Sequence, residues 1–335
     1  IQKMIVAPSM AAYRPTTTSG WFAGSYVTSI EGLEYLNTSE VTDMSGMFWS
    51  AQVESLDLSH FNTSKVTNMR EMFGCYRLKS LDLSTFDTRN VTDMNSMFAG
   101  CESLESLDVS GLNTQNVIYM SDMFSGLKLT TLDLSNFNTS KVQFMDGMFC
   151  ASKFTSLDLR SFDTHEVVNM GDMFNSCDNL RSLNLSSFDV SNVYILERMF
   201  YKCANLQSLN LGNFNTKTAT TMEMMFDGCT SLESLDVSHF DTSNVETMEQ
   251  MFSNCRSLKS LDVSGFDTKN VENMGWMFTE CGNLETLDVS HFDTSNTWYF
   301  KGMFAGCRKL KKIDVSHFDT SKAESEIIED RKSVV

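Results

Sequence analysis

Residue types used in hydrolytic and zinc chemistry occur in this sequence, but they recur as parts of a regular pattern. Ser238, His239 and Asp241 lie close together and are the three residue types of a serine-hydrolase triad. The same order recurs at Ser290-His291-Asp293 and at Ser316-His317-Asp319. His165 opens an H-E-x-x-H zinc motif, but Asn169 stands where the second histidine ligand is required. Because a catalytic site needs one asymmetric group of residues, we expect no enzymatic activity.

A row of aspartates could instead hold calcium or another cation. One aspartate recurs every 25 or 26 residues, at Asp57, Asp82, Asp108, Asp133 and Asp158. On strands stacked about 4.8 Å apart these carboxylates would repel one another by roughly 1 kcal/mol or more, which a cation or hydroxyl donors would relieve. Serine donors are at hand, since Ser80 and Ser84 flank Asp82. We therefore expect a hydrogen-bonded Ser-Asp-Ser surface with no metal and no cofactor; a calcium row is the alternative.

These residues belong to a repeat that runs through most of the chain. The motif L-D-L or L-D-V, with small variations, begins at Leu56, Leu81, Leu107, Leu132, Leu157, Leu183, Leu209, Leu235, Leu261, Leu287 and Ile313. A Met-Phe pair keeps step with it, beginning at Met47, Met72, Met97, Met123, Met148, Met173, Met199, Met225, Met251, Met277 and Met303. Eleven copies at a period of 25 or 26 residues are typical of a solenoid, in which each repeat is one coil.

One copy of the repeat predicts one strand and one short helix. Residues 81–84 alternate apolar and polar, which is the pattern of a half-buried strand. Within residues 91–101 the apolar residues fall at offsets 0, 3, 6, 7 and 10, which is the spacing of a short helical face. Asp87 and Thr88 lie just before that segment, where their oxygens can cap the start of a helix.

Stacking of such coils predicts an α/β solenoid of the leucine-rich-repeat type. We expect about eleven coils of 25–26 residues, with a parallel sheet on one face and short helices or helical turns on the other. A single coil cannot bury its own apolar edge, so the core must run along the stack. The recurring methionines and cysteines fall on the apolar side of the coil, and we expect the cysteines to be buried, reduced and structural.

The amino-acid sequence of the repeat resembles the repeats of a known family. Residues 235–245, followed by Met251-Phe252 and Cys255, are similar to the BspA-like leucine-rich repeats of bacterial surface proteins, and residues 30–39 resemble that family's first repeat. The resemblance covers about residues 20 to 322. It implies a bacterial protein that is secreted or displayed on the cell surface and is used for adhesion or host contact, without catalytic residues.

Charge and composition narrow the class of partner. The chain has 26 Lys+Arg against 43 Asp+Glu, a formal charge of -17, which would repel nucleic acid and anionic lipid. It also lacks the run of about 20 apolar residues that a spanning helix needs, so we expect no membrane insertion. Departures from the repeat predict an N-terminal cap over residues 1–29, the solenoid over 30–322, and a C-terminal cap or tail over 323–335.

Candidate binding residues lie where the repeat is broken. The two residues ahead of the first methionine of each copy are usually polar, but apolar residues replace them in some copies. These residues are Ile118, Tyr119, Phe144, Tyr194, Ile195, Trp298 and Tyr299. Exposed apolar residues in matching positions indicate an interaction surface, although lateral packing between molecules or drift of the repeat also accounts for them.

We therefore predict a non-enzymatic, extracellular binding or adhesion solenoid of a host-associated bacterium. Its partner would be a protein or glycan ligand on host or neighbouring cells. One alternative is a structural spacer or a self-assembling surface subunit. A second alternative is a carbohydrate-binding module.

Overall fold

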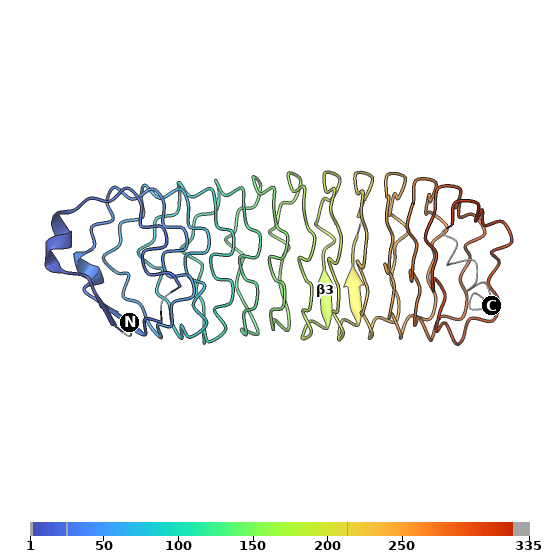
Figure 1. Cartoon of the computed structure of the whole chain (residues 1–335), viewed down its shortest axis with the longest axis horizontal. Helices are drawn as coiled ribbons and strands as arrows, with labels where there is room; N and C mark the ends of the chain where they lie inside the picture. Colours follow the sequence, from blue (N-terminus) through green and yellow to red (C-terminus); the bar gives the residue numbers. More distant parts are fainter. Residues whose placement is uncertain (1–2, 25, 213, 324–335) are drawn as a thin grey trace. The chain divides into compact units, whose positions relative to one another are not determined.

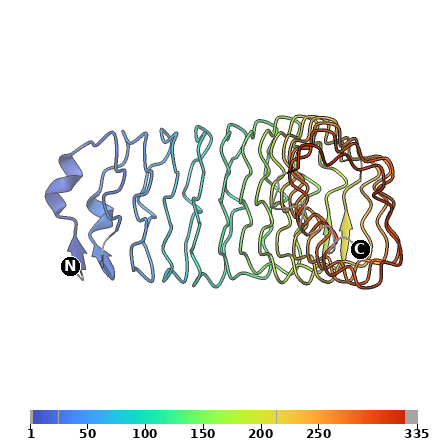
Figure 2. The same cartoon turned by 45° about the vertical axis from the view of Figure 1, so that its right-hand side comes forward.

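The computed structural model describes residues 3–24, 26–212 and 214–323. Its internal contacts divide the chain into two units, Ile1–Glu166 and Val167–Val335. Within each unit, successive coils of the chain lie side by side (Figures 1 and 2). The predicted C-terminal cap or tail lies, apart from Ala323, outside the described residues.

The first unit begins with its only regular elements among the described residues. They are strand β1 (Lys3–Ile5), 3-10 helix η1 (Pro8–Ala12), strand β2 (Ser29–Glu31) and 3-10 helix η2 (Leu33–Tyr35). β1 and β2 pair in parallel, with Met4 opposite Ile30. Residues 17–24, within the predicted N-terminal cap, bond to the following coil as later coils do; Phe22 N–H, for example, donates to Met47 O at 2.9 Å.

The second unit contains strands β3 (Ser182–Asn184) and β4 (Ser208–Asn210), drawn as the two neighbouring arrows in Figure 1. They pair in parallel, with Leu183 opposite Leu209. Both strands lie in the Leu-Asp-Leu part of the repeat, where the sequence predicts the sheet. A single parallel bridge, Ser260 to Thr286, lies at the corresponding position of two later coils.

The coils are joined mainly through the segment around the Met-Phe pair. In the coil with residues 94–100, every second backbone N–H donates to a carbonyl of the following coil. The bonds run from Met94, Ser96, Phe98 and Gly100 to Tyr119, Ser121, Met123 and Ser125, at 2.9, 2.7, 3.1 and 2.8 Å. The intervening N–H groups of Met97 and Ala99 bond to carbonyls three residues earlier, which forms successive turns. We call such a segment the ladder segment of its coil.

The prediction of short helices over segments such as 91–101 is therefore wrong. The ladder segments are turns, and the described part of the chain contains no α-helix. An α-helix would use the N–H groups within the segment, each bonded four residues back, whereas the ladder directs every second one to the next coil. Ser96 and Gly100 have positive φ angles of 53° and 70°, which bend the chain at each turn. An apolar spacing of three and four residues fits such turns as well as a helix.

The predicted sheet is present only in part. Residues 81–84 show the expected alternation, because Leu83 is buried, Leu81 is half-buried and Asp82 and Ser84 are exposed. No strand forms there in this coil. The Asp82 Oδ1 accepts from the Ser84 N–H at 2.9 Å. Asn184 makes the same bond to the Ser186 N–H at 3.1 Å at the end of β3, so this local turn is compatible with strand pairing.

The core consists of columns of identical side chains. Phe73, Phe98 and Phe124 are fully buried, and their neighbouring ring centroids lie 5.8 Å apart with nearly parallel planes. The Cys101 thiol donates to Phe73 O of the preceding coil at 2.7 Å, and burial raises the pKa of Cys101 to about 12. The prediction of burial is confirmed for Cys75, Cys101, Cys177, Cys203, Cys229, Cys255 and Cys281, whereas Cys150 and Cys307 are only half-buried.

A buried threonine column adds polar bonds between coils. Thr88 Oγ1 donates to Asn113 O at 2.9 Å and accepts from Asn113 N–H at 2.7 Å. Thr63 and Thr139 bond in the same way to Asp87 and Asp163 of their following coils. The Asp-Thr pair therefore links coils, and the prediction that it caps a helix is wrong.

Candidate functional site

The candidate site is built on one position of the ladder, which we call the outer slot, where Thr17 and Tyr119 are exposed and the other residues are half-buried. It is the residue directly before the first methionine of the repeat, or before the residue that replaces that methionine. Parallel bridges join Thr17, Asp43, Asn68, Asp93, Tyr119 and Phe144 in the first unit, and Asn169, Ile195, Thr221, Thr247, Asn273 and Tyr299 in the second. Outer-slot residues are thus held at the spacing of a parallel sheet.

Most outer slots carry a side chain that completes a local turn. Asp93 Oδ1 accepts from the backbone N–H two residues later at 2.9 Å, and Asn273 Oδ1 does the same at 2.9 Å. Thr247 Oγ1 accepts in the same way at 3.3 Å. A net contribution of about 1 kcal/mol is typical of such a bond. Aspartate, asparagine and threonine are therefore the residues that the local backbone favours in this slot.

Two aromatic residues occupy consecutive outer slots in the first unit. Tyr119 and Phe144 are bridge partners, and their rings stack with centroids 5.3 Å apart and planes 14° apart. Tyr119 is 39% exposed, whereas Phe144 and the adjacent Ile118 are half-buried. Neither aromatic ring can accept the N–H two residues later. The Ser121 N–H instead donates to Asn95 Oδ1 of the preceding coil at 2.7 Å.

A second aromatic group lies in the second unit. Tyr299 occupies an outer slot, its ring lies 5.6 Å from that of Trp298 and 5.4 Å from that of Trp276, and Trp298 is 39% exposed. Two glycines make room for these rings. A Cβ on Gly275 would lie 2.5 Å from the Tyr299 ring, and one on Gly302 would lie 2.5 Å from Trp276 Cδ1.

The remaining two predicted residues also belong to the second unit. Tyr194 is 51% exposed, and Ile195 is half-buried in an outer slot. A Cβ on Gly171 would lie 3.2 Å from Ile195 Cγ2, so the glycine of the preceding coil again accommodates the apolar side chain. The structure thus places Tyr119 beside Phe144, Tyr194 beside Ile195, and Trp298 beside Tyr299.

The aspartate row is satisfied by its own chain. The Oδ1 atoms of Asp57, Asp82, Asp108 and Asp133 accept from the serine N–H two residues later at 2.9 to 3.1 Å. The hydroxyl and the backbone N–H of that serine together lower the pKa of each of these carboxyls. Asp158 also binds the Arg160 guanidinium at 2.6 Å, which lowers the pKa of Asp158 to about 2. Among the residues that the structure describes, no group of three His, Cys, Asp or Glu is placed to hold a metal ion.

The sequence model of one protein family, described as "Mycoplasma protein of unknown function, DUF285", matches this chain. The matched residues are 16–125, 74–183, 174–284 and 255–327, which together cover most of the chain. The chain belongs to the DUF285 family. No curated protein matches it. No helix of the described part of this DUF285 chain has the length and apolarity needed to cross a membrane.

Several solved structures are similar to this DUF285 chain. A leucine-rich-repeat protein from Eubacterium ventriosum is 14% identical with a TM-score of 0.41, covering 96% of this chain and 81% of its own. A leucine-rich cell surface protein from Faecalibacterium prausnitzii is 15% identical with a TM-score of 0.35, covering 94% and 87%. The functional domain of InlJ from Listeria monocytogenes, which includes a cysteine ladder, is 14% identical with a TM-score of 0.29, covering 85% and 63%. The DUF285 chain thus spans about 63% of the length of the InlJ structure.

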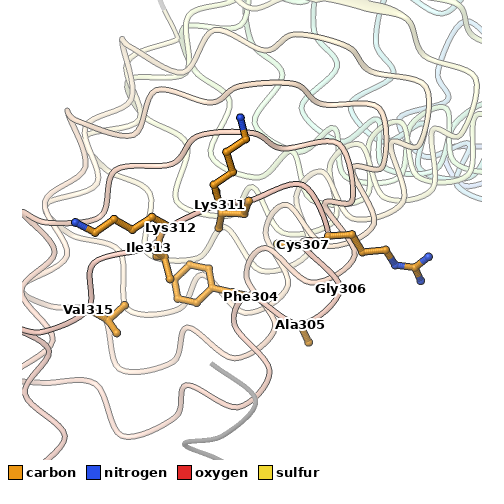
Figure 3. A pocket seen from close by; sticks show the side chains of 10 residues that line it. Phe304, Ala305, Gly306, Cys307, Lys311, Lys312, Ile313 and Val315 are labelled. Carbon is orange, nitrogen blue, oxygen red and sulfur yellow. The ribbon is translucent and has the colours of Figure 1, made fainter. Parts of the chain in front are cut away.

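Two features of the DUF285 chain were missed by sequence reasoning. Trp276 joins the aromatic group although it lies two residues after the methionine, and the nearby glycines 275 and 302 are the signal that could have indicated it. A pocket of about 470 Å³ also lies in the last described coil, with Phe304 and Ile313 among its lining residues (Figure 3). The basic side chains of Lys311 and Lys312 border it and point outward in that view.

Proposed function

We propose that the protein is a non-enzymatic binding or adhesion solenoid, secreted or displayed on a bacterial surface. In this proposal the apolar outer slots contact a macromolecule of a host or neighbouring cell. The sequence resemblance to BspA-like surface proteins supports the location and the class of function. The observation that carries the proposal is the stacked pair Tyr119 and Phe144 on the exposed side of the ladder.

The physical argument for binding is that the Tyr119 and Phe144 pair is less favourable for the stability of the unbound protein than polar residues would be. A polar residue in the outer slot would complete the local turn, as Asp93 does at 2.9 Å. Neither Tyr119 nor Phe144 can make that bond, although Asn95 supplies another acceptor to the Ser121 N–H. The exposed Tyr119 and the half-buried Phe144 also keep apolar surface in water. Aromatic side chains that a partner then buries contribute roughly 2 kcal/mol or more at an interface hot spot. Binding explains why residues unfavourable for the isolated coil occupy consecutive slots.

The experiment replaces both rings by the residue that the slot favours. Tyr119→Asn with Phe144→Asn supplies two turn acceptors, so the melting temperature is expected to change by only a few degrees. Binding of the purified protein to host extracellular matrix and to intact cells should fall at least about tenfold, as loss of one hot spot implies.

The control changes two aspartates of Leu-Asp-Val segments in the second unit instead. Asp262→Asn with Asp288→Asn keeps both Oδ1 acceptors of the serine turns and removes two charges. We expect this variant to bind as the unaltered protein does. If the control abolishes binding and the outer-slot variant is silent, the binding site lies on the Ser-Asp surface and the proposal is wrong.

Self-assembly is the second candidate function, because a stacked aromatic pair can also meet a second copy. Light scattering separates the two: a self-assembling subunit would become monomeric on Tyr119→Asn with Phe144→Asn, whereas a binder would lose only its external partner. A spacer would be unchanged in both assays. A carbohydrate-binding module would give selective binding on a glycan array that the same substitutions remove.

We also expect no requirement for calcium. Each aspartate of the row has a backbone donor two residues away, so the turn holds without a cation. Binding of calcium to the native state alone would add about 2.7 kcal/mol at a hundred times the dissociation constant. Thermal unfolding with and without a chelator is expected to give the same melting temperature within about one degree. A large loss in chelator would assign the row as a cation site.

A further inference from the structure

We propose that a second surface, on the second unit, binds a basic polypeptide segment through its arginine or lysine side chains. This Trp298 surface comprises Trp276, Trp298, Tyr299, Glu246 and Glu272. The inference rests on the proposed function, because it names the partner chemistry of one of the apolar slots. It concerns residues of one unit only.

The backbone places these side chains in adjoining rows. Glu272 N–H donates to Glu246 O at 2.8 Å, and Trp298 N–H donates to Glu272 O at 2.9 Å. Glu246, Glu272 and Trp298 therefore hold the same register position on three consecutive coils, and all three are exposed. The neighbouring row contains Tyr299, which is bridged to Asn273 of the preceding coil. Two carboxylates and the Trp298 ring thus share one exposed strip, beside the half-buried Tyr299 ring.

The aromatic part of this strip is maintained against local preferences. Tyr299 lacks the turn acceptor that Asn273 supplies to Gly275 N–H at 2.9 Å. Trp276 has a φ of 53°, the left-handed conformation that this position also has in other coils, as at Ser96 and Gln250, but a bulky ring is unusual in it. Gly275 and Gly302 have no Cβ at the places where the rings of Tyr299 and Trp276 lie. These features arrange the rings without covering Trp298.

The acidic part of the strip has no counter-charge. Elsewhere, glutamates pair with a lysine of the neighbouring coil, as Glu233 does with Lys259 at 2.6 Å and Glu54 with Lys79 at 2.6 Å. No ion pair within the described residues involves Glu246 or Glu272. Carboxylates on adjacent coils repel each other, and a positive group between them would remove that repulsion.

A cationic side chain fits both halves of the strip. A guanidinium or ammonium over the Trp298 face interacts with the ring quadrupole, and its N–H groups reach carboxylates beside the ring. Arginine fits better than lysine, because its planar guanidinium stacks on aromatic rings and bonds carboxylates with two N–H groups. A neutral glycan would stack on the rings but would leave Glu246 and Glu272 repelling each other. Basic polypeptide is therefore the ligand class that the charges favour.

The experiment uses the full chain and a fluorescently labelled peptide of seven arginines, followed by fluorescence anisotropy. Trp298→Ala should weaken binding about tenfold, the effect of a partly desolvated cation–π contact. Glu246→Gln with Glu272→Gln should weaken it and flatten its dependence on salt. Glu272→Lys is the variant of choice if Trp298→Ala lowers the melting temperature, because it reverses an exposed charge.

Asp262→Asn with Asp288→Asn is the matched control, since it removes the same number of charges from the Ser-Asp surface. The inference is overturned if this control weakens peptide binding as much as the glutamate pair does, which would indicate attraction to the net charge alone. It is also overturned if N-acetylchitohexaose binds in a Trp298-dependent manner and the peptide does not. Neither result touches the test of Tyr119 and Phe144, so failure here is distinguishable from failure of the proposed function.

Discussion

Within one coil, the ladder segment 94–100 and the Leu-Asp-Leu segment 81–84 meet their neighbours differently. The ladder segment donates four backbone bonds to the next coil, at 2.7 to 3.1 Å. Beside residues 81–84 the adjacent coils are joined by the bond from Glu105 N–H to Lys79 O at 3.1 Å, and the Asp82 side chain takes the Ser84 N–H. Register between coils is therefore determined on the ladder side.

The difference explains where this protein can vary. On the ladder side the backbone bonds are made whatever side chain fills the outer slot, so aspartate, threonine, tyrosine and isoleucine all occur there. On the Leu-Asp-Leu side the aspartate itself holds the turn, as at Asp57, Asp82 and Asp108. New surface chemistry can thus appear in the outer slots without loss of inter-coil backbone bonds.

The largest expected effect is a difference in stability loss between a core substitution in the ladder segment and one in the Leu-Asp-Leu segment. Phe98 is fully buried between Phe73 and Phe124, so Phe98→Ala should lower the free energy of unfolding by about 3–5 kcal/mol. Leu81 is only half-buried, and Leu81→Ala should cost about 1 kcal/mol. Urea unfolding of the two variants measures both values. Equal losses would mean that the Leu-Asp-Leu segment holds the coils as firmly as the ladder.

The next largest effect concerns the threonine column. Thr88→Val removes the buried hydroxyl that bonds both N–H and C=O of Asn113, and leaving these part-buried groups unpaired should cost about 1–3 kcal/mol. Thr85 of the same coil is exposed, and Thr85→Val is the matched control, expected to lie within about 0.5 kcal/mol of the unaltered protein. A silent Thr88→Val would show that the column contributes no net stability.

Burial could be predicted from the sequence more closely than backbone geometry. The repeat places Leu83, Val91, Met94 and Cys101 on the apolar side, and all four are buried. The helix was predicted wrongly because an apolar spacing of three residues satisfies both an α-helix and a succession of turns. Only the hydrogen-bond partners distinguish them, and those partners lie on the next coil, outside the window that periodicity examines.

The candidate site shows a similar division. The repeat identifies Tyr119 and Phe144 as exceptions in one column, and the structure stacks them at 5.3 Å. The repeat does not reveal that Trp276, which lies in a different column, packs against Tyr299, with ring centroids 5.4 Å apart. That contact depends on side-chain reach across Gly275. A column alignment compares equivalent positions and therefore cannot identify contacts between different columns.

A smaller effect tests backbone conformation on the two sides. Gly100 has a φ of 70° and open space around a Cβ, so Gly100→Ala should cost about 1 kcal/mol from conformation alone. Gly111 on the Leu-Asp-Leu side also has open space but lacks that conformation, and Gly111→Ala should be neutral or stabilise by up to about 1 kcal/mol. Ser96 has a φ of 53°, and Ser96→Gly should not destabilise. Opposite signs for the two alanine variants, measured by urea unfolding, are the expected result; equal effects would contradict it.

The smallest effect is the pH dependence of two aspartates, one on each side. Burial raises the pKa of Asp93 in its outer slot, whereas the Arg160 side chain lowers the pKa of Asp158 to about 2. The stability contributed by Asp93 is therefore complete below the ordinary aspartate pKa and is lost as pH rises through its raised value. The contribution of Asp158 is present above the ordinary pKa and is lost as pH falls toward 2.

Two substitutions measure these opposite slopes. Asp93→Asn keeps an oxygen for the Asn95 N–H but carries no charge, so its stability relative to the unaltered protein should increase between pH 3 and pH 7. Arg160→Gln removes the ion pair with Asp158, so the pKa of Asp158 should rise toward the ordinary value. The loss of stability in acid should then be smaller and should be complete at a higher pH. Urea midpoints across this range, with carboxyl shifts followed by NMR, test both. If Asp93→Asn instead lost stability toward pH 7, the outer slot would favour a charged carboxylate. Its polar residues would then contribute more than the oxygen that accepts the turn N–H.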